Sequence, residues 1–160
     1  MESRASWRIG QASADDLGLA RALMEAYAAS LGIDLDAQGF GEEIAGLPGP
    51  YAPPRGALLL AFDAQGEALG SIALRPLAPE VGEIKRLYVT PRGRGLGLGK
   101  ALVAAVLGRA RHIGYREIKL DTLPEMKEAI ALYKSLGFEP IPPYGSFPYP
   151  GLLCFGQRID

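Results

Sequence analysis

The 160-residue sequence has little of what marks secreted, metal-binding or membrane proteins, with one cysteine and one histidine. Cys154 cannot form a disulfide within the chain or supply a cysteine metal cluster by itself. Charged Glu2 and Arg4 follow Met1 at once, so the start of the chain does not resemble a signal peptide. The apolar run Gly56–Phe62 is too short to cross a bilayer and suits a buried strand. We therefore expect a soluble protein in the reducing cytoplasm.

The sequence also lacks an excess of charge of either sign. Its 17 Lys and Arg residues against 18 Asp and Glu residues give a net charge of -1. No broad basic field is available to attract nucleic acid or an anionic membrane, so any anion site must be local. A hydrophobic content of 48% and a charged content of 22% are typical of a globular protein. This length predicts a single domain over residues 1–160.

Apolar periodicity and turn residues predict strands alternating with helices. Strands are expected at 6–11, 57–62, 68–77, 81–89, 117–122 and 152–158, and helices at 13–31, 37–45, 97–113 and 124–136. The strand 117–122 should run parallel to 81–89, because a helix crosses between them. The segment 47–56 holds four prolines, which predict an ordered surface loop that borders the site.

A glycine-rich loop, Arg92–Lys100 (RGRGLGLGK), joins a predicted strand to a predicted helix. A Walker phosphate loop is excluded, because Arg94 stands where its first glycine belongs and Ala101 stands where Ser or Thr belongs. A dinucleotide-binding fingerprint fails in each register that starts at a glycine of this loop. Neither an ATPase loop nor a Rossmann site is therefore indicated.

What remains in the loop is the pattern Arg94-x-x-Gly97-x-Gly99. This resembles the cofactor loop of the GNAT superfamily of acyl-CoA N-acyltransferases, which reads Q/R-x-x-G-x-G/A at a strand-to-helix turn. Glycines let the main chain approach a pyrophosphate, and the free N–H groups and dipole at a helix start favour its charge. A register beginning at Arg92 also satisfies the pattern but places Lys100 where the helix needs an apolar residue, so we prefer Arg94. An ordinary tight glycine turn is the alternative reading of this loop.

A second segment, Ala129–Phe138 (AIALYKSLGF), resembles the helix A-x-x-L-Y-x-x-x-G-F that often ends the acetyl-CoA core of this superfamily. The resemblance implies that Tyr133 lies near the CoA sulfur and protonates the departing thiolate. The spacing by itself favours a core tyrosine on an apolar helix face, and only the resemblance reverses that. Met126 occupies the position where an asparagine is often found.

The resemblance also implies a general base on the strand before the loop. Glu83 lies eleven residues before Arg94, a separation at which family members can place a glutamate base. An amine is almost wholly protonated at neutral pH, so a carboxylate that takes its proton, directly or through a water chain, is useful for generating the nucleophile. The alternative is an ion pair of Glu83 with Lys85 or Arg86 on a solvated strand face, and Asp121 and Glu80 are weaker candidates for the base.

The resemblance covers Val81–Phe138 and implies an α/β (α+β) fold with a mixed, mostly antiparallel sheet of six to seven strands flanked by helices. It implies transfer of an acetyl group from acetyl-CoA to an amine by direct attack, with no metal. The main chain of Leu87–Val89 would hold the pantetheine arm, and the Val89 amide would polarise the thioester carbonyl. The residues implied in cofactor binding are Leu87, Tyr88, Val89, Arg94, Gly95, Leu96, Gly97, Leu98, Gly99 and Lys100.

Two other functions stay open at this stage. One is a non-catalytic CoA-binding or regulatory module of the same fold, and the other is an interaction domain with a tight glycine turn. The expected partner is a small-molecule or peptide amine, without nucleic acid or membrane, and a homodimer is left open. The proline-rich loops carry Tyr51, Tyr144, Phe147 and Tyr149, which either border the acceptor cleft or cover the core.

Overall fold

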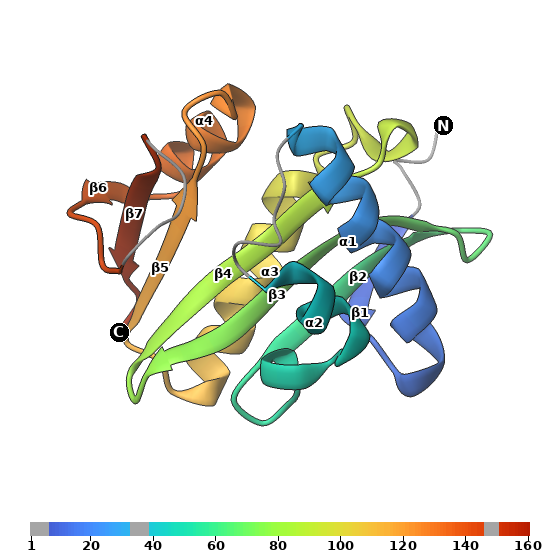
Figure 1. Ribbon diagram of the computed structural model, residues 1–160, viewed down its shortest axis with the longest axis horizontal. Helices are drawn as coiled ribbons and strands as arrows, with labels where there is room; N and C mark the ends of the chain where they lie inside the picture. The colour runs from blue at the N-terminus through green and yellow to red at the C-terminus, as the bar shows by residue number, and fades with distance from the viewer. Residues whose placement is uncertain (1–6, 33–38, 146–150) are drawn as a thin grey trace, which may run out of the picture.

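The computed structural model describes residues 7–32, 39–145 and 151–160, which form a seven-stranded sheet in the order β1-β2-β3-β4-β5-β7-β6 (Figure 1). The elements are β1 (Trp7–Gln11), α1 (Leu17–Leu31), α2 (Phe40–Ala45), β2 (Ala57–Asp63), β3 (Ala68–Ala78), β4 (Val81–Val89), α3 (Leu98–Ile113), β5 (Glu117–Thr122), α4 (Lys127–Ser135), β6 (Glu139–Ile141) and β7 (Leu153–Arg158). Neighbouring strands pair antiparallel except β4 and β5, which are parallel. The predicted mixed, mostly antiparallel sheet flanked by helices is confirmed.

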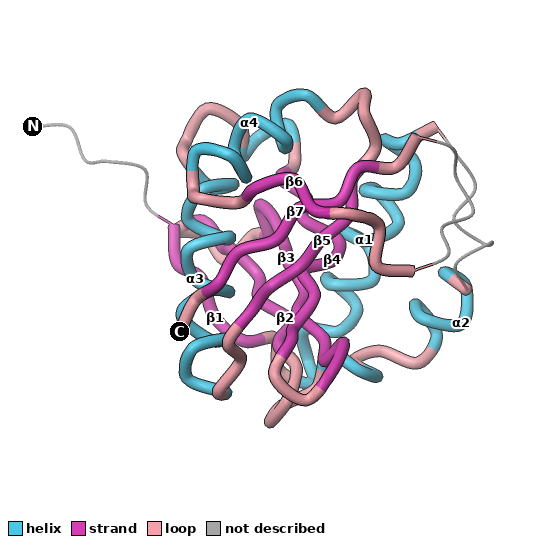
Figure 2. The backbone as a smooth tube through the Cα atoms, turned by 90° about the vertical axis from the view of Figure 1, so that its left-hand side faces the viewer, coloured by secondary structure: helices cyan, strands magenta, loops and turns pink. Residues whose placement is uncertain are grey.

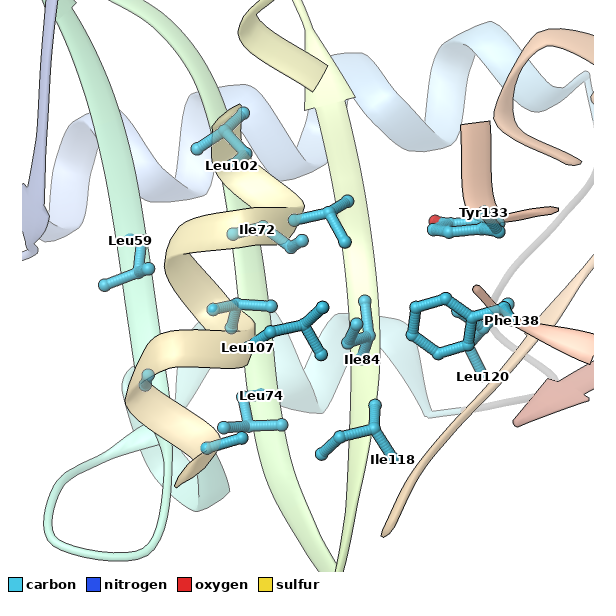
Figure 3. Close-up of a cluster of buried hydrophobic side chains, with 14 of the residues drawn as sticks. Leu59, Ile72, Leu74, Ile84, Leu102, Leu107, Ile118, Leu120, Tyr133 and Phe138 are labelled. Carbon is cyan, nitrogen blue, oxygen red and sulfur yellow. The ribbon is translucent and has the colours of Figure 1, made fainter. Parts of the chain in front are cut away.

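Helices cover both faces of the sheet, with α1 and α2 on one face and α3 and α4 on the other (Figure 2). The larger core lies between the sheet and α3 and α4. Figure 3 labels ten of its residues: Leu59, Ile72, Leu74, Ile84, Leu102, Leu107, Ile118, Leu120, Tyr133 and Phe138. Each such side chain stabilises the fold by about 1.5–3 kcal/mol relative to an exposed one. This burial holds α3 and α4 against the strands that carry the site.

Glycines with a positive φ end α1 and α3, and another such glycine begins α3. Gly32 (φ 68°) follows α1, Gly114 (φ 110°) follows α3, and Gly97 (φ 78°) precedes α3. A left-handed backbone conformation is strained for residues with a Cβ, which is why these boundaries were readable from the sequence. The predicted ends of these two helices are confirmed.

Two elements near the carboxyl end differ from the prediction. The helix expected from Pro124 begins at Lys127, because residues 124–126 first form a turn in which the Met126 N–H donates to the Leu123 carbonyl. Residues 139–141 form the strand β6, which is not among the strands expected from the sequence. Pro140 is tolerated there because β6 lies at the sheet edge, where a missing N–H leaves no neighbouring strand unpaired.

The proline-rich segment 47–56 is an exposed loop over Pro50, Pro53 and Pro54, as predicted, but it packs on the sheet below α1 and does not border the site. It forms a short 3-10 turn and buries Leu47 and Tyr51 against the face of the sheet that α1 covers. The reason is that these two apolar side chains complete the smaller core below α1. The helix expected over 37–45 begins at Phe40, and residues 37 and 38 lie outside the described residues. Phe147 and Tyr149 of the later proline-rich loop also lie outside the residues that the structure describes.

A β-bulge interrupts β4 in the middle of the sheet. Tyr88 faces Ser71 and Lys85 faces Ala73, so two β4 residues oppose a single β3 residue between these pairs. The backbone accommodates the extra residue at Arg86, whose φ of 62° lies in the left-handed region that is uncommon for residues other than glycine. The bulge turns Arg86 toward α1 and α2.

Arg86 forms a buried ion pair with Glu43 of α2. Its Nη2 donates to Oε1 at 2.7 Å and its Nε donates to Oε2 at 3.1 Å. The Tyr51 hydroxyl donates to the same carboxylate at 2.7 Å, and the guanidinium lies 5.2 Å from the Phe40 ring centre and 5.9 Å from that of Tyr27. Burial by itself would raise the pKa of Glu43, but Arg86 outweighs it and holds that pKa below its ordinary value. The pair thus fixes the bulge to both helices.

The parallel pairing of β4 with β5 is short. It joins Val81 to Glu117, Gly82 to Ile118 and Glu83 to Lys119, and β5 then continues its pairing with β7 to Thr122. Figure 1 shows β4 and β5 close together at one end and diverging toward the other. The edge of Leu87–Val89 that faces away from β3 therefore has no partner strand among the described residues.

We expect Arg86→Met to lower the free energy of unfolding by about 3–5 kcal/mol, because Glu43 stays buried without its cation. Urea unfolding followed by circular dichroism measures this. The loss should shrink as the pH falls through the lowered pKa of Glu43, since that pair stabilises only while the carboxylate is charged. The control is Arg92→Met, which removes an exposed arginine paired with Asp63 and should have a far smaller effect. Equal losses in the two variants would contradict a structural role for the buried pair.

Candidate active site

A cavity of about 580 Å³ lies beside the free edge of β4. It is bounded by the end of α1, the end of β4, the glycine loop and the start of α4. Its lining residues are Tyr27, Ser30, Leu87, Tyr88, Val89, Gly93, Arg94, Gly95, Gly97, Leu98, Gly99, Glu125, Met126, Lys127, Glu128, Ala129 and Leu132. A cavity of this size suits a large organic ligand.

The glycine loop holds its conformation through positive φ angles at Gly95 (80°) and Gly97 (78°). No atom lies within 4 Å of a Cβ built at either residue, so the backbone angle is what requires glycine. α3 begins directly after Gly97, and the first N–H groups of a helix have no partner within it. These donors and the helix dipole make the loop a site for an anionic group.

The two arginines of the loop have different surroundings, which support the register that begins at Arg94. Arg94 lines the cavity, and its Nε donates to the Val89 carbonyl at 3.3 Å. Arg92 instead pairs with Asp63 at 2.7 Å and with Glu67, at the turn between β2 and β3. Arg92 is therefore held away from the cavity.

Most of the residues predicted for the cofactor lie together in this cavity. They are Leu87, Tyr88, Val89, Arg94, Gly95, Gly97, Leu98 and Gly99. The cavity lining does not include Leu96 or Lys100, whose side chains are exposed. Their assignment as cofactor-binding residues stays a prediction.

The main chain at the end of β4 offers hydrogen-bonding groups to the cavity. The Thr90 N–H donates to the Leu69 carbonyl of β3 at 2.8 Å. Because successive N–H groups of a strand point to opposite edges, the Val89 N–H points to the free edge. A carbonyl oxygen placed beside β4 could accept a hydrogen bond there.

Tyr133 is buried on α4, where its ring packs edge-to-face against Phe138 with 5.8 Å between the ring centres. Figure 3 shows its hydroxyl on the side that faces β4. Burial, with smaller contributions from Tyr27 and Asp121, raises the pKa of Tyr133 far above its ordinary value. The phenol therefore stays protonated at neutral pH and is available as a proton donor.

A small second cavity of about 30 Å³ adjoins the large one. It is lined by Tyr27, Ile84, Lys85, Arg86, Leu87, Asp121, Thr122, Met126, Ala129 and Tyr133, of which Tyr27, Leu87, Met126 and Ala129 also line the large cavity. Its volume has room for a water molecule or the amino group of a ligand. Charged groups thus meet Tyr133 at the inner end of the site.

Glu83 has different partners from those expected. It is 2% exposed, its Oε1 accepts from Arg75 Nε at 2.7 Å, and its Oε2 accepts from the Tyr144 hydroxyl at 2.5 Å. The predicted alternative of a solvated pair with Lys85 or Arg86 is therefore wrong, because the side chain is buried and its nearest cation comes from β3. Glu83 does not line either cavity. Its assignment as the base stays a prediction.

The two weaker candidates for the base lie at opposite ends of the sheet. Glu80 is exposed in the turn between β3 and β4 and lies 3.7 Å from Arg116, away from the free edge of β4. Asp121 of β5 lines the small cavity with Tyr133. Burial and, less strongly, the charge of Glu83 raise the pKa of Asp121, while Lys85 opposes the shift. Only Asp121 of these two therefore shares a cavity with Tyr133.

Sequence reasoning missed Arg75 as the partner of Glu83, and it considered Lys85 only as an ion-pair partner of Glu83 and not as a residue that lines the small cavity. The strand alternation that places Glu83 and Lys85 on the same face of β4 was readable, but the opposition of Arg75 to Glu83 depends on strand register. Within residues 7–32, 39–145 and 151–160, no group of three or more His, Cys, Asp or Glu residues is placed to hold a metal ion. None of the helices in these ranges is long and apolar enough to span a bilayer.

Comparison with known sequences finds the acetyltransferase (GNAT) family, whose model matches residues 32–138. An uncharacterized N-acetyltransferase of Schizosaccharomyces pombe is 40% identical over 139 residues, covering 86% of this chain and 85% of that protein. Mouse N-acetyltransferase 8 is 33% identical over 102 residues, which cover 61% of this chain and 45% of that protein. The chain thus spans most of the yeast relative and about half of the mouse one.

Solved structures with the same fold include a GNAT acetyltransferase of Staphylococcus aureus, with a TM-score of 0.82 and 20% identity over 97% of this chain and 100% of that one. Another is the YncA protein of Salmonella typhimurium, solved with its cofactor acetyl-CoA. It has a TM-score of 0.67 and 20% identity over 98% of this chain and 95% of that one. At these identities the likeness establishes the fold.

Proposed function

Because the chain belongs to the acetyltransferase (GNAT) family, we propose that it transfers an acetyl group from acetyl-CoA to the amino group of an acceptor. One observation carries the proposal. The anion-binding start of α3 opens into a cavity that follows the free edge of β4 and adjoins the buried proton donor Tyr133. Such a site can hold a long ligand with a phosphate at one end and a reacting group at the other.

In this proposal the glycine loop holds the pyrophosphate of CoA. The main-chain N–H groups of residues 95–99 donate to the phosphate oxygens, and the exposed Arg94 adds a positive charge beside them. The pantetheine arm lies along Leu87–Val89 and replaces the strand partner that β4 lacks. The Val89 N–H then donates to the thioester oxygen, which becomes more negative as the amine attacks.

Tyr133 supplies the proton that the leaving thiolate needs. A thiolate of pKa near 8.5 leaves more easily when a neighbouring phenol can protonate it. The burial that keeps Tyr133 protonated, and its place beside the inner end of the large cavity, support this role. Its contacts with the core position the ring, so the catalytic and structural readings of this tyrosine are compatible.

The acceptor in this proposal is a small-molecule or peptide amine. An aminoglycoside N(6')-acetyltransferase of Stenotrophomonas maltophilia is 35% identical over 96 residues, which cover 55% of this chain and 63% of that protein. It supports an amine as the acceptor class. A cytoplasmic location is part of the same proposal and is supported by the lone, buried Cys154.

The test is release of CoA thiol from acetyl-CoA in the presence of a panel of amines: aminoglycosides, amino acids, polyamines and short peptides. CoA binding is measured separately by calorimetry. Turnover with an amine supports the proposal. Binding of CoA without turnover would instead identify the non-catalytic module, and absence of binding would overturn both.

Gly97→Val should weaken CoA binding by about a hundredfold, because the valine disfavours the left-handed backbone that aims the loop donors at the phosphates. Loss of charge-assisted hydrogen bonds worth about 3 kcal/mol accounts for that factor. The matched control is Gly108→Val, at an exposed position in α3 where a Cβ meets no atom within 4 Å. A folded Gly97→Val protein with unchanged affinity would sink the assignment of the loop.

Tyr133→Phe should lower kcat by about a hundredfold, the lower end of general-acid effects, and leave CoA affinity unchanged. The control is Tyr115→Phe, which removes a hydroxyl that donates to the Arg55 carbonyl at 2.7 Å, far from both cavities. Steady-state kinetics and calorimetry measure the two quantities. Unchanged turnover in Tyr133→Phe would return this residue to a purely structural role.

A further inference from the structure

The small cavity brings two charged side chains of opposite sign close to the Tyr133 phenol, and neither of them has an ion-pair partner within 4.0 Å in the part of the chain that the structure describes. Asp121 comes from β5, Lys85 from β4 and Tyr133 from α4, and all three line the same space of about 30 Å³. Asp121 and Lys85 sit where β4 and β5 diverge, so neither strand covers the space between them. A group that enters from the large cavity would meet all three.

Asp121 is free to bind a proton or a ligand, and Glu83 is not. Among the described residues, no hydrogen bond or ion pair within 4.0 Å ends on the Asp121 carboxylate or on the Lys85 ammonium. Both Glu83 oxygens, in contrast, already accept hydrogen bonds, from Arg75 and Tyr144. A group that takes a proton from a substrate needs an oxygen within reach of that substrate. This requirement favours Asp121.

We propose that Asp121 is the group that takes the proton from the acceptor amine. The neighbouring charges of Lys85 and Glu83 change, in opposite directions, how readily Asp121 takes that proton. The inference rests on the proposed function and deepens it. Glu83 becomes a positioning residue, which holds Arg75 and Tyr144 and places a negative charge near Asp121.

The proton balance of the reaction follows from this arrangement. The ammonium form of the acceptor gives one proton to Asp121, and the neutral amine attacks the thioester carbon. The C–N bond forms, the C–S bond breaks, and the sulfur takes the proton of the Tyr133 hydroxyl. A second proton from the nitrogen restores Tyr133, and Asp121 releases its own proton to solvent. Acetyl-CoA and the ammonium thus yield the amide, CoA thiol and one free proton.

The surroundings of Asp121 make its carboxylate a stronger base than an ordinary aspartate. Burial raises the pKa of Asp121, and the neighbouring Glu83 raises it further. The titratable and charged groups around it are Lys85, Glu83 and Arg86 of β4, Arg75 of β3, Tyr27 of α1, Tyr133 of α4, Cys154 of β7, and Tyr144. The opposing charge of Lys85 limits the shift, so its removal should raise the pKa of Asp121.

The experiment compares Asp121→Asn, Glu83→Gln and Lys85→Met by their pH profiles of kcat/KM, using the best amine of the panel. Asp121→Asn should lose about a hundredfold in kcat/KM at neutral pH and lose the acidic limb of the profile. Glu83→Gln should keep that limb but move it to lower pH, because the negative charge of Glu83 no longer raises the pKa of Asp121. Lys85→Met should move it to higher pH. The control Asp15→Asn, at an exposed aspartate outside both cavities, should match the wild type.

If Glu83 is the base instead, Glu83→Gln removes the limb and Asp121→Asn only shifts it, which overturns the proposal. Carbon-13 NMR titration of the aspartate carboxyls tests the role of Asp121 without any turnover, so its failure can be told apart from failure of the proposed function. The Asp121 signal is assigned as the one missing from the Asp121→Asn spectrum. Should no amine be acetylated, the proposed function fails. An Asp121 carboxyl that titrates at or below about 3.9, the ordinary aspartate value, would overturn the role of Asp121 by itself. A higher value that rises further in Lys85→Met supports it.

Discussion

The early end of the pairing between β4 and β5 is the constraint on which the rest of the site depends. Past Glu83 and Lys119 the two strands share no further pairs, and no strand within residues 7–32, 39–145 and 151–160 pairs with the edge of β4 at Leu87–Val89. An unpaired strand edge presents polar main-chain groups that need a partner. The free edge therefore forms one wall of the large cavity and offers it main-chain donors and acceptors. The same divergence leaves space between Asp121 and Lys85.

Two ion pairs, Arg86–Glu43 and Arg75–Glu83, hold β4 beside the place where it diverges from β5. Burying their charged groups costs desolvation free energy. Arg86 occupies the bulge of β4 and is held by Glu43 of α2, which ties the strand to the helices on that face. Arg75 and Tyr144 donate hydrogen bonds to the buried carboxylate of Glu83, which lies on the same strand. Buried charges persist only when they are paired and hydrogen-bonded. In these two networks the carboxylates of Glu43 and Glu83 are already paired. Asp121 lines the small cavity, and its carboxylate has no such partner among the described residues.

Several features could be predicted because they depend on residues near one another in the chain. The glycine loop follows a strand and begins a helix, and the positive φ angles at Gly95 and Gly97 are conformations that the residue type makes accessible. Other predictions failed where distant packing decides. In the segment 47–56, Leu47 and Tyr51 are buried in the smaller core, where the Tyr51 hydroxyl donates a hydrogen bond to Glu43. The strand β6 forms despite Pro140 because β7 is there to pair with.

The candidacy of Tyr133 came from the resemblance to the GNAT superfamily, because its spacing alone suits a core residue. Local pattern alone was enough for the order of the predicted elements, the parallel placement of β5 beside β4, and the glycine loop at the start of a helix. Each of these follows from periodicity or from a backbone preference that operates within a few residues. The partners of Glu83, the orientation of Arg92 toward Asp63, and the meeting of Asp121, Lys85 and Tyr133 were decided only by the tertiary structure. They depend on strand register and on where the sheet separates, because a shift of one residue would move a side chain to the opposite face.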